Sequence, residues 1–287
     1  NIRCGNSLIS GDRCNDDTWI LINIENTFNQ DLDKIILLKN RYFKAIEDED
    51  KNEILKEIKT IGQKINSDLN EHLFKNYGKI IEKIKPFNYN VAFCEVFKDG
   101  GFDVVFGNPP YVRADVDDFH FKCREIILNT GNYKTLYEKC DLYLAFIEKG
   151  INLLKKNGIF GMIISDAYMT SKYTIKNHQW LWSEKTINQI DFFDNIKIFE
   201  DAVVKNIILF VKNIKNPDFK PVKILHKDRF ENSINLPSTE QKKFKEDIFK
   251  KDVVKKIKID VADTERLGDI CYISYGLRPN SDERFFK

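Results

Sequence analysis

Long apolar runs are missing from this 287-residue sequence. No stretch approaches the roughly 18 to 20 uncharged apolar residues that a membrane-spanning helix needs, so we expect no integral membrane protein. The chain also lacks a basic segment followed by an apolar one at its start, which is the pattern of a secretory signal, so we expect a cytoplasmic location. It begins at Asn1 rather than at methionine, which favours a piece of a longer parent chain.

Patterns typical of metal sites are lacking as well. The six cysteines form no Cys-x-x-Cys pair, and the four histidines are scattered along the chain. Asp115, Asp117 and Asp118 cluster, but no strand with a Glu-x-Lys pattern accompanies them, so a solvated loop is expected there rather than a magnesium site. We therefore expect buried, reduced cysteines and no metal.

An excess of charge of one sign is also absent. The chain has 46 basic and 44 acidic residues and a formal net charge of +2, so no bulk charge indicates a nucleic-acid partner. Between Lys205 and Lys258, basic residues outnumber acidic ones by about two to one. A solvated surface explains this excess, and contact with phosphates is the alternative.

Apolar residues recur in patterns that predict an α/β fold with an inserted helical hairpin. Between residues 29 and 84 they return at helical spacing on two stretches, with a break expected at 48–50. Strands are expected at 2–9, 91–93, 103–106, 159–164, 187–193 and 203–211, and a helix at 141–154, ended by Asn157-Gly158. The alternation of strands and helices indicates a doubly wound sheet, in which the strand at 103–106 is covered on both faces.

The predicted organisation has three parts. A partial catalytic domain spans residues 1–213 and includes the hairpin. A basic linker follows at 214–266, with Ile224 and Ile234 on short strands. The run at 267–287 alternates like the first strand of a second module.

The segment from Asn108 to Tyr111 contains the candidate catalytic residues. It follows the strand at 103–106 directly, and ligands of an open α/β sheet bind at the carboxyl ends of its strands. Pro109 and Pro110 fix φ and remove two donors, which leaves stiff, outward-facing carbonyl groups. An asparagine oxygen and a rigid carbonyl can accept both hydrogens of a planar –NH₂ group. The aromatic side chain can stack on the ring that carries this group.

This segment resembles a known family. Residues 102–112, Phe-Asp-Val-Val-Phe-Gly-Asn-Pro-Pro-Tyr-Val, are similar to the catalytic motif of DNA amino-methyltransferases of the adenine-N6 type, particularly the methylase part of type II and IIG restriction-modification enzymes. Residues 141–146, 154–158 and 159–165 resemble the helix, glycine turn and strand that follow in that family. Residues 198–204 and 3–8 resemble its later aromatic loop and the strand end that contacts the cofactor. Residues 268–276 resemble the start of a target recognition domain.

The resemblance implies a partial Rossmann-like methyltransferase sheet and a mechanism. Double-stranded DNA is the implied partner, with adenine flipped out of the duplex. Asn108 and the Pro109 carbonyl then hold the amino group, and Tyr111 and Phe199 sandwich the ring. S-adenosylmethionine is the implied cofactor, with Asn6, Phe146 and Asn108 at its pocket. Tyr168 and Lys172 are expected to border the DNA from their position alone.

The sequence departs from the family at the cofactor. In the family, a glycine-rich loop holds the methionine moiety of the cofactor and an acidic residue holds its ribose; neither is found upstream of Asn6. At the position of Asn6 itself, many relatives carry aspartate. We expect these parts to come from a missing N-terminal part of the parent chain, which in many fused relatives also carries a nuclease domain. The fragment alone is expected to be a poor or inactive enzyme.

Other functions stay open at this level. Protein glutamine methyltransferases resemble the chain at Asn108–Tyr111, because an amide –NH₂ poses the same problem, and an RNA amino group is a related substrate. A non-catalytic DNA-binding subunit is the third alternative. The aromatic loop at Phe199 favours a planar base, and the intact motif favours catalysis.

Overall fold

The computed structural model describes residues 5–11, 19–110, 118–130, 132–137, 140–193, 196, 198, 205–227 and 232–243, with only the backbone for 19–27. Contacts divide the chain into two units, residues 1–251 and 252–287, and the second lies outside the described residues. None of the helices described is long and apolar enough to cross a membrane.

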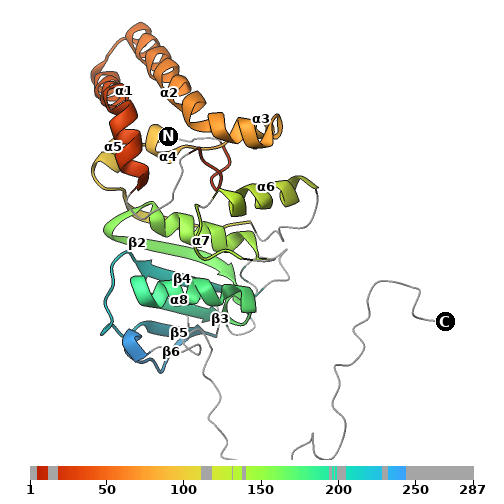
Figure 1. The fold of residues 1–287 in the computed structure, drawn as a ribbon. Helices are drawn as coiled ribbons and strands as arrows, with labels where there is room; N and C mark the ends of the chain where they lie inside the picture. The colour runs from red at the N-terminus through yellow and green to blue at the C-terminus, as the bar shows by residue number, and fades with distance from the viewer. Residues whose placement is uncertain are drawn as a thin grey trace, which may run out of the picture. The chain divides into compact units, whose positions relative to one another are not determined.

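The centre of the fold is a six-stranded mixed sheet (Figure 1). Its strands are β1 (Phe102–Gly107), β2 (Leu154–Ser165), β3 (Thr186–Phe193), β4 (Asn206–Lys212), β5 (Val222–His226) and β6 (Ser233–Leu236). The spatial order is β1-β2-β4-β3-β5-β6. β1 pairs with β2 in parallel and β3 with β5 in parallel, whereas β4 runs antiparallel to both of its neighbours and β6 to β5. β1, β2, β3 and β5 therefore point the same way.

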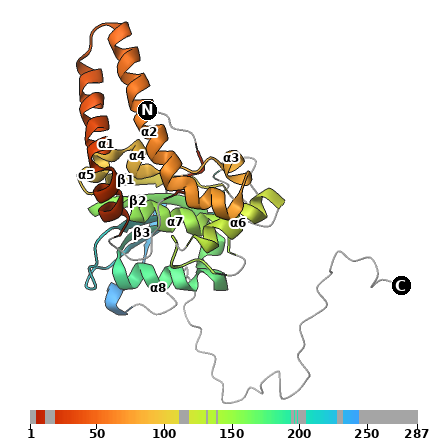
Figure 2. The same ribbon diagram turned by 45° about the horizontal axis from the view of Figure 1, so that its top comes forward.

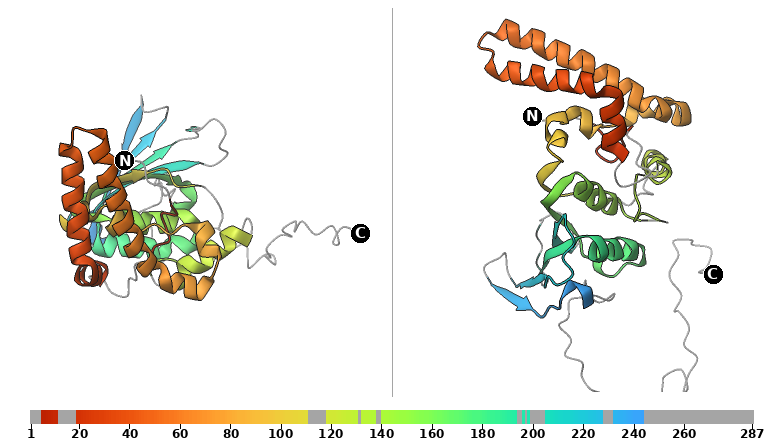
Figure 3. Two further views of the ribbon diagram at one scale, coloured as in Figure 1. Left: turned by 90° about the horizontal axis from the view of Figure 1, so that it is seen from above. Right: turned by 60° about the vertical axis from the view of Figure 1, so that its left-hand side comes forward.

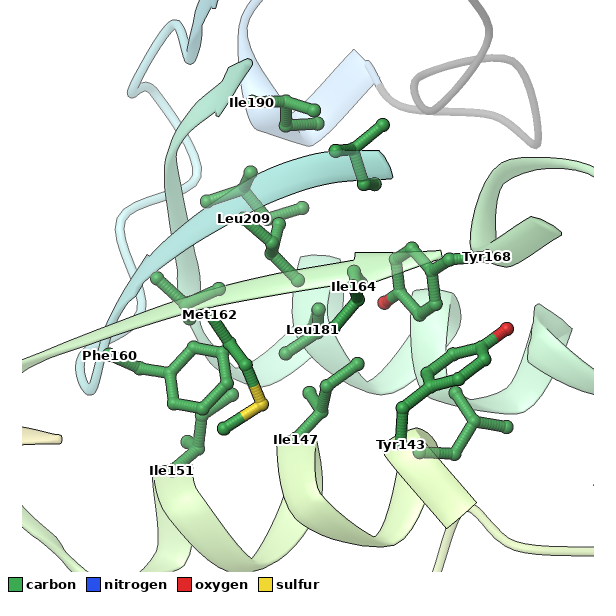
Figure 4. Close-up of a cluster of buried hydrophobic side chains, with 14 of the residues drawn as sticks. Tyr143, Ile147, Ile151, Phe160, Met162, Ile164, Tyr168, Leu181, Ile190 and Leu209 are labelled. Carbon is green, nitrogen blue, oxygen red and sulfur yellow. The ribbon is translucent and has the colours of Figure 1, made fainter. Parts of the chain in front are cut away.

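Two helices, α7 (Leu142–Asn152) and α8 (Ile175–Glu184), cover one face of this sheet (Figures 1 and 3). On α7 the apolar side chains recur every three or four residues, so Tyr143, Ile147 and Ile151 form one stripe. Figure 4 shows this stripe facing Phe160 and neighbouring side chains of β2. Burial of these side chains fixes the helices to the sheet.

β1 has a different environment from the one predicted. The strand lies where expected, but it is at the edge of the sheet and pairs only with β2 among the described strands. Val105 faces the helix, since a Cβ on Gly150 would lie 3.4 Å from its Cγ1. Val104 and Phe106 alternate to the other face, where they are 54% and 82% exposed. The prediction of a strand covered on both faces is wrong for the described residues.

The turn after α7 also differs. Asn157 and Gly158 do not end the helix, which stops at Asn152; they lie inside β2. Asn157 has φ of 69°, and the pairing with β1 shifts register between Phe102 and Val104. The Asn-Gly pair makes a bulge in the strand, because both residues tolerate backbone angles that a regular ladder excludes.

The inserted hairpin is confirmed. It consists of α1 (Trp19–Lys44) and α2 (Asp48–Tyr77), which run side by side in Figures 1 and 2. The acidic residues at 48–50 start α2 rather than break the chain, as negative charge stabilises a helix N-terminus. Short helices follow: α3 (Ile80–Ile84), α4 (Tyr89–Ala92) and α5 (Cys94–Lys98).

α4 stands in place of the strand predicted at 91–93. Val91 and Cys94 are buried against Leu32, Ile35 and Ile65 of the hairpin. A three-residue apolar run does not distinguish a strand from a buried helical turn, and tertiary packing against the hairpin selects the turn.

The described part of the strand predicted at 2–9 forms no strand either. Asn6 makes an isolated parallel bridge to Pro86, and a turn follows. Hydrogen bonds to the segment 85–88 hold it: the Asn6 N–H donates to the Lys85 carbonyl (2.8 Å), the Phe87 N–H to the Ile9 carbonyl (2.8 Å) and the Gly11 N–H to Asn88 Oδ1 (2.7 Å).

The region expected as a basic linker contributes to the sheet. β5 and β6 lie within 214–266, so the strands predicted around Ile224 and Ile234 are confirmed. Gln241, in a short 3₁₀ turn (Gln241–Lys243), is buried beside β3: its Oε1 accepts from the Ile187 N–H (3.0 Å), and its Nε2 donates to the Trp182 carbonyl (3.0 Å). The limits of the catalytic domain at 213 and of the second module at 267 stay predictions.

Candidate functional site

Asn108, Pro109 and Pro110 leave β1 at its carboxyl end. Asn108 and Pro110 are exposed, whereas Pro109 is buried. The rigid dipeptide thus anchors one ring in the protein and leaves the asparagine side chain in solvent. This arrangement agrees with the stiff, outward-facing turn that the sequence predicts.

Other segments reach the same edge of the sheet. β2 ends there at Ser165 and passes into a 3₁₀ turn, η1 (Asp166–Met169). Ser165 pairs with Asn206 at the start of β4, and the Asp166 N–H donates to the Lys205 carbonyl (2.9 Å). β3 ends at this edge too, since its strand direction equals that of β2. The chain between Phe193 and Lys205 therefore leaves from and returns to the edge at which Asn108 lies.

Two of the predicted site residues, Tyr111 and Phe199, lie outside the described residues. The segment that carries Phe199 is anchored at β4, two strands from β1. Strands are about 4.8 Å apart, so that anchor lies about 10 Å from the end of β1. The topology brings Pro110 and Lys205, described residues that border the two segments, to one edge of the sheet, and the positions of Tyr111 and Phe199 stay predictions.

Asn6 is half-buried in its turn, and its side chain has a local role. Asn6 Oδ1 accepts from the N–H groups of Leu8 (3.0 Å) and Ile9 (3.3 Å). An amide oxygen has two lone pairs, and both are directed to these donors. Asn6 Oδ1 is thus engaged within the turn, and the other hydrogen-bonding group of the side chain is Nδ2, a donor.

Phe146 lies on α7, whose N-terminus points to the Asn108 edge because the helix runs opposite to β2. The ring is half-buried and packs against both the sheet cluster and a second cluster that includes Leu8 and Ile9. The Tyr133 hydroxyl donates to the Leu8 carbonyl (2.6 Å), which ties the Asn6 segment to the loop before α7. The structure thus brings Asn6 and Phe146 into one neighbourhood.

A buried polar network behind this neighbourhood was not predicted. Glu148 of α7 is 1% exposed, and its carboxylate accepts from the Lys134 N–H (2.6 Å), the Thr135 N–H (3.0 Å) and the Thr135 hydroxyl (2.6 Å). Asn177 Nδ2 donates to Thr135 Oγ1 (3.0 Å), and the Tyr168 hydroxyl donates to Asn177 Oδ1 (2.7 Å). Burial raises the pKa of Glu148, and the donors that it accepts from oppose that rise.

A second polar contact joins the start of α7 to the segment after η1. The Tyr173 hydroxyl donates to Asp141 Oδ2 (2.6 Å), and the Tyr143 hydroxyl lies 3.5 Å from that of Tyr173. Burial raises the pKa values of both tyrosines, so they stay protonated at neutral pH. Together the two sets of contacts fix α7, α8 and the 132–137 loop relative to the Asn108 edge.

Tyr168 belongs to this interior. It is 0% exposed and packs edge-on against His178, with ring centroids 4.5 Å apart. The prediction that Tyr168 borders DNA is therefore wrong, because its ring fills the core between β2 and α8 (Figure 4). Lys172 is exposed, as a residue at a DNA surface must be.

One signal in the sequence pointed to the missed network. Glu148 stands on the apolar stripe of α7, one turn after Leu144 and one before Ile151. A carboxylate at such a position is rarely buried without donors around it. The donors themselves come from distant segments, so only the fold identifies them. Among the residues described, no group of three histidine, cysteine or acidic side chains is placed to hold a metal ion.

Proteins described as type II methyltransferases are similar in sequence to part of this chain. M.BstVI of Geobacillus stearothermophilus, a type II methyltransferase, is 31% identical over 127 residues, which are 44% of this chain and 22% of that protein. RM.Eco57I of Escherichia coli, a type II restriction enzyme and methyltransferase, is 27% identical over 118 residues, which are 41% of this chain and 12% of that protein. The chain thus spans less than a quarter of the length of these two relatives.

Solved structures give looser overlaps. The type IIL restriction-modification enzyme MmeI in complex with DNA has a TM-score of 0.39 at 13% identity, over 61% of this chain and 24% of that one. The M protein of the type I restriction enzyme EcoKI has a TM-score of 0.34 at 15% identity, over 44% of this chain and 25% of that one. These overlaps are too loose to carry a conclusion about this chain.

The comparison with protein families shows to which family the chain belongs. The family described as Eco57I restriction-modification methylase matches residues 20–199, which is more than half of the chain and includes β1, the Asn108 turn and the inserted hairpin. The match confirms the resemblance to methylases of type II restriction-modification systems that the sequence predicted. The chain belongs to the Eco57I restriction-modification methylase family.

Proposed function

We propose that this chain is part of a DNA methyltransferase of a restriction-modification system, which transfers a methyl group from S-adenosylmethionine to N6 of a flipped-out adenine in double-stranded DNA. The observation that carries the proposal is the Asn108-Pro109-Pro110 turn at the carboxyl end of β1, with Asn108 exposed and Pro109 anchored. Family membership supports the restriction-modification context.

The residues of the turn have separate roles in this proposal. Asn108 Oδ1 and the Pro109 carbonyl accept the two amino hydrogens of adenine, which directs the nitrogen lone pair towards the methyl carbon. Tyr111 and Phe199 stack on the two faces of the base. When bound, S-adenosylmethionine would supply the methyl group on a sulfonium, whose sulfur leaves as a neutral thioether when the C–S bond breaks. The contribution of Asn108 is positioning and a fixed dipole, and the amino nitrogen loses its extra proton to solvent.

The neighbourhood of Asn6 and Phe146 fits an adenosine moiety. Phe146 presents a half-buried ring, and Asn6 Nδ2 is a donor suited to a ring nitrogen. No glycine-rich loop occurs upstream of Asn6 in this sequence. We propose that a further segment of the parent protein supplies that loop. It would pair with the edge of β1 that has no strand beside it among the described residues, and would cover the face on which Val104 and Phe106 are exposed.

The test uses the full-length parent protein, tritiated S-adenosylmethionine and mixed-sequence duplex DNA, which is then digested to nucleosides. Label in N6-methyladenosine is the expected result. Asn108→Ala should abolish methyl transfer while DNA binding stays within a few-fold. Asn129→Ala is the matched control, because Asn129 is an exposed asparagine at the end of α6 (Asp118–Asn129).

Three outcomes contradict the proposal. Wild-type turnover by Asn108→Ala refutes the role of the turn. Label in another nucleoside refutes the adenine-N6 specificity. Absence of label on DNA, with label on a protein amide or on RNA instead, shows that the methyl acceptor is one of those substrates and not DNA.

A further inference from the structure

A cavity of about 950 Å³ lies away from the Asn108 edge, between α1, α2 and the segment 85–95. We call it the hairpin groove. Its walls are one face of each helix. On α1 the lining residues Ile35, Lys39, Tyr42 and Phe43 recur at spacings of four, three and one, and on α2 they run from Leu55 to Asn66 with a similar periodicity. The groove therefore follows the length of the hairpin.

The groove has a mixed lining, and its exposed apolar side chains lie towards the far end of the hairpin. Near the base, α4 and α5 cover the helices through Val91 and Cys94. Beyond that cover, Phe43 is 77% exposed, Leu55 is 45% exposed, and Ile46 in the connecting turn is 90% exposed. Exposed apolar side chains that lie together on one surface are typical of sites that contact another molecule.

The shape of the groove fits a helix. Eleven residues of α2 separate Leu55 from Asn66, which corresponds to about 16 Å at 1.5 Å per residue, or about three helical turns. Gly62 lies mid-groove, and a Cβ there would contact only Val91 Cγ1, at 4.0 Å. The small residue leaves room for a helix to approach, and two parallel ridges with a furrow between them are the usual seat of a third helix.

The charged side chains of the groove indicate which charge a helix that binds there would carry. Lys59 and Lys85 line the groove, both are exposed, and neither forms an ion pair within the part of the chain that the structure describes. Lys39, in contrast, is bound to Glu95 (2.5 Å) and to the Ala92 carbonyl (3.0 Å). Two positive charges without partners beside an apolar furrow complement a ligand with apolar and acidic residues on adjacent faces.

We propose that the hairpin groove binds an acidic amphipathic helix of about three turns, supplied by a partner protein segment. Its apolar residues would contact Tyr42, Phe43 and Leu55, and its carboxylates would meet Lys59 and Lys85. This role is independent of the proposed methyl transfer, because the groove contains none of the residues assigned to the reaction.

The test is fluorescence anisotropy with the full 287-residue chain and labelled 12-residue helical peptides. One peptide has leucine at positions i, i+3, i+4 and i+7 with glutamate on the flanks, a second has lysine in place of every glutamate, and a third has serine in place of every leucine. Only the acidic, leucine-bearing peptide is expected to bind in the micromolar range, and its affinity should fall as salt is added.

Variants locate the binding. The double change Lys59→Glu and Lys85→Glu should weaken the acidic peptide by at least about tenfold and strengthen the basic one. Lys56→Glu is the matched control, since Lys56 is exposed on α2 outside the groove. Leu55→Ser should weaken binding, whereas Phe74→Ser, a change at an exposed residue of α2 outside the groove, should not. Far-UV circular dichroism shows whether each variant keeps its helices.

Several results overturn the proposal. Equal binding of the acidic and basic peptides does so, as does an unchanged affinity in the double lysine variant. Binding of a 12-nucleotide single-stranded DNA that depends on Lys59 and Lys85, with no binding of the acidic peptide, makes the groove a nucleic-acid surface instead.

Discussion

His178 offers a direct test of the packing beneath the site. It lies on α8, is 5% exposed, and packs against the ring of Tyr168. Burial lowers its pKa from an ordinary value of 6.5 to about 3, because the interior disfavours the charged imidazolium. In the unfolded chain the same group titrates near its ordinary value.

The sign and size of the effect follow from linkage. Because the folded pKa is depressed, the unfolded state binds more protons between pH 6.5 and about 3. The stability linked to His178 is therefore complete above pH 6.5 and is lost as the pH falls through that window. Each pH unit costs about 1.4 kcal/mol, so at pH 5.0 the loss is about 2 kcal/mol.

The assay is urea unfolding of the wild type and of His178→Gln at pH 7.5 and 5.0, followed by tryptophan fluorescence, since Trp180 and Trp182 stand on the same helix. Between the two pH values the wild type should lose about 2 kcal/mol more than the variant, which has no ionisable group at 178. Gln179→Ala, a change at an exposed residue of the same helix that does not titrate, is the matched control and should retain the wild-type pH dependence. An equal loss in wild type and His178→Gln would refute the reasoning.

Two further predictions concern buried polar contacts. Glu148→Ala leaves three donors of the 134–135 segment without their acceptor and should lower the free energy of unfolding by about 3 kcal/mol, measured by urea unfolding at pH 7. The exposed Glu125→Ala is its control, and a loss below about 1 kcal/mol contradicts the network. Gln241→Ala removes the acceptor of the Ile187 N–H and should speed hydrogen exchange of that amide, whereas the exposed Gln179→Ala on α8 should not. Unchanged exchange at Ile187 in Gln241→Ala would mean that the 241–243 turn does not secure β3.

Much of the fold is readable in the sequence because it depends on local periodicity. The 3.6-residue spacing of apolar residues predicts the hairpin and α7. The range of α7 agrees with the structure to within a few residues, whereas α1 begins at Trp19, ten residues before the predicted start of the hairpin, and α2 ends at Tyr77. Continuous apolar runs predict β1, β2, β3 and β4. The turn at Asn108 is readable as well, because consecutive prolines after a strand restrict the backbone whatever surrounds them.

Other features depend on contacts between distant segments, and the sequence misassigns them. Residues 91–93 form a helical turn because the hairpin buries Val91, and β1 is exposed because only β2 pairs with it among the described strands. Tyr168 follows a strand as a DNA-facing residue would, yet the core encloses it.

By itself the sequence determined most of the element types, the helical insertion and the stiff turn that follows β1, since each rests on neighbouring residues. Tertiary structure alone decided that Asn6 Oδ1 is occupied, that Glu148 is buried with its donors, and that a groove runs along the hairpin, lined by two lysines that form no ion pair with any described residue. Those properties arise where segments far apart in the chain meet, and no local pattern records which segments these are.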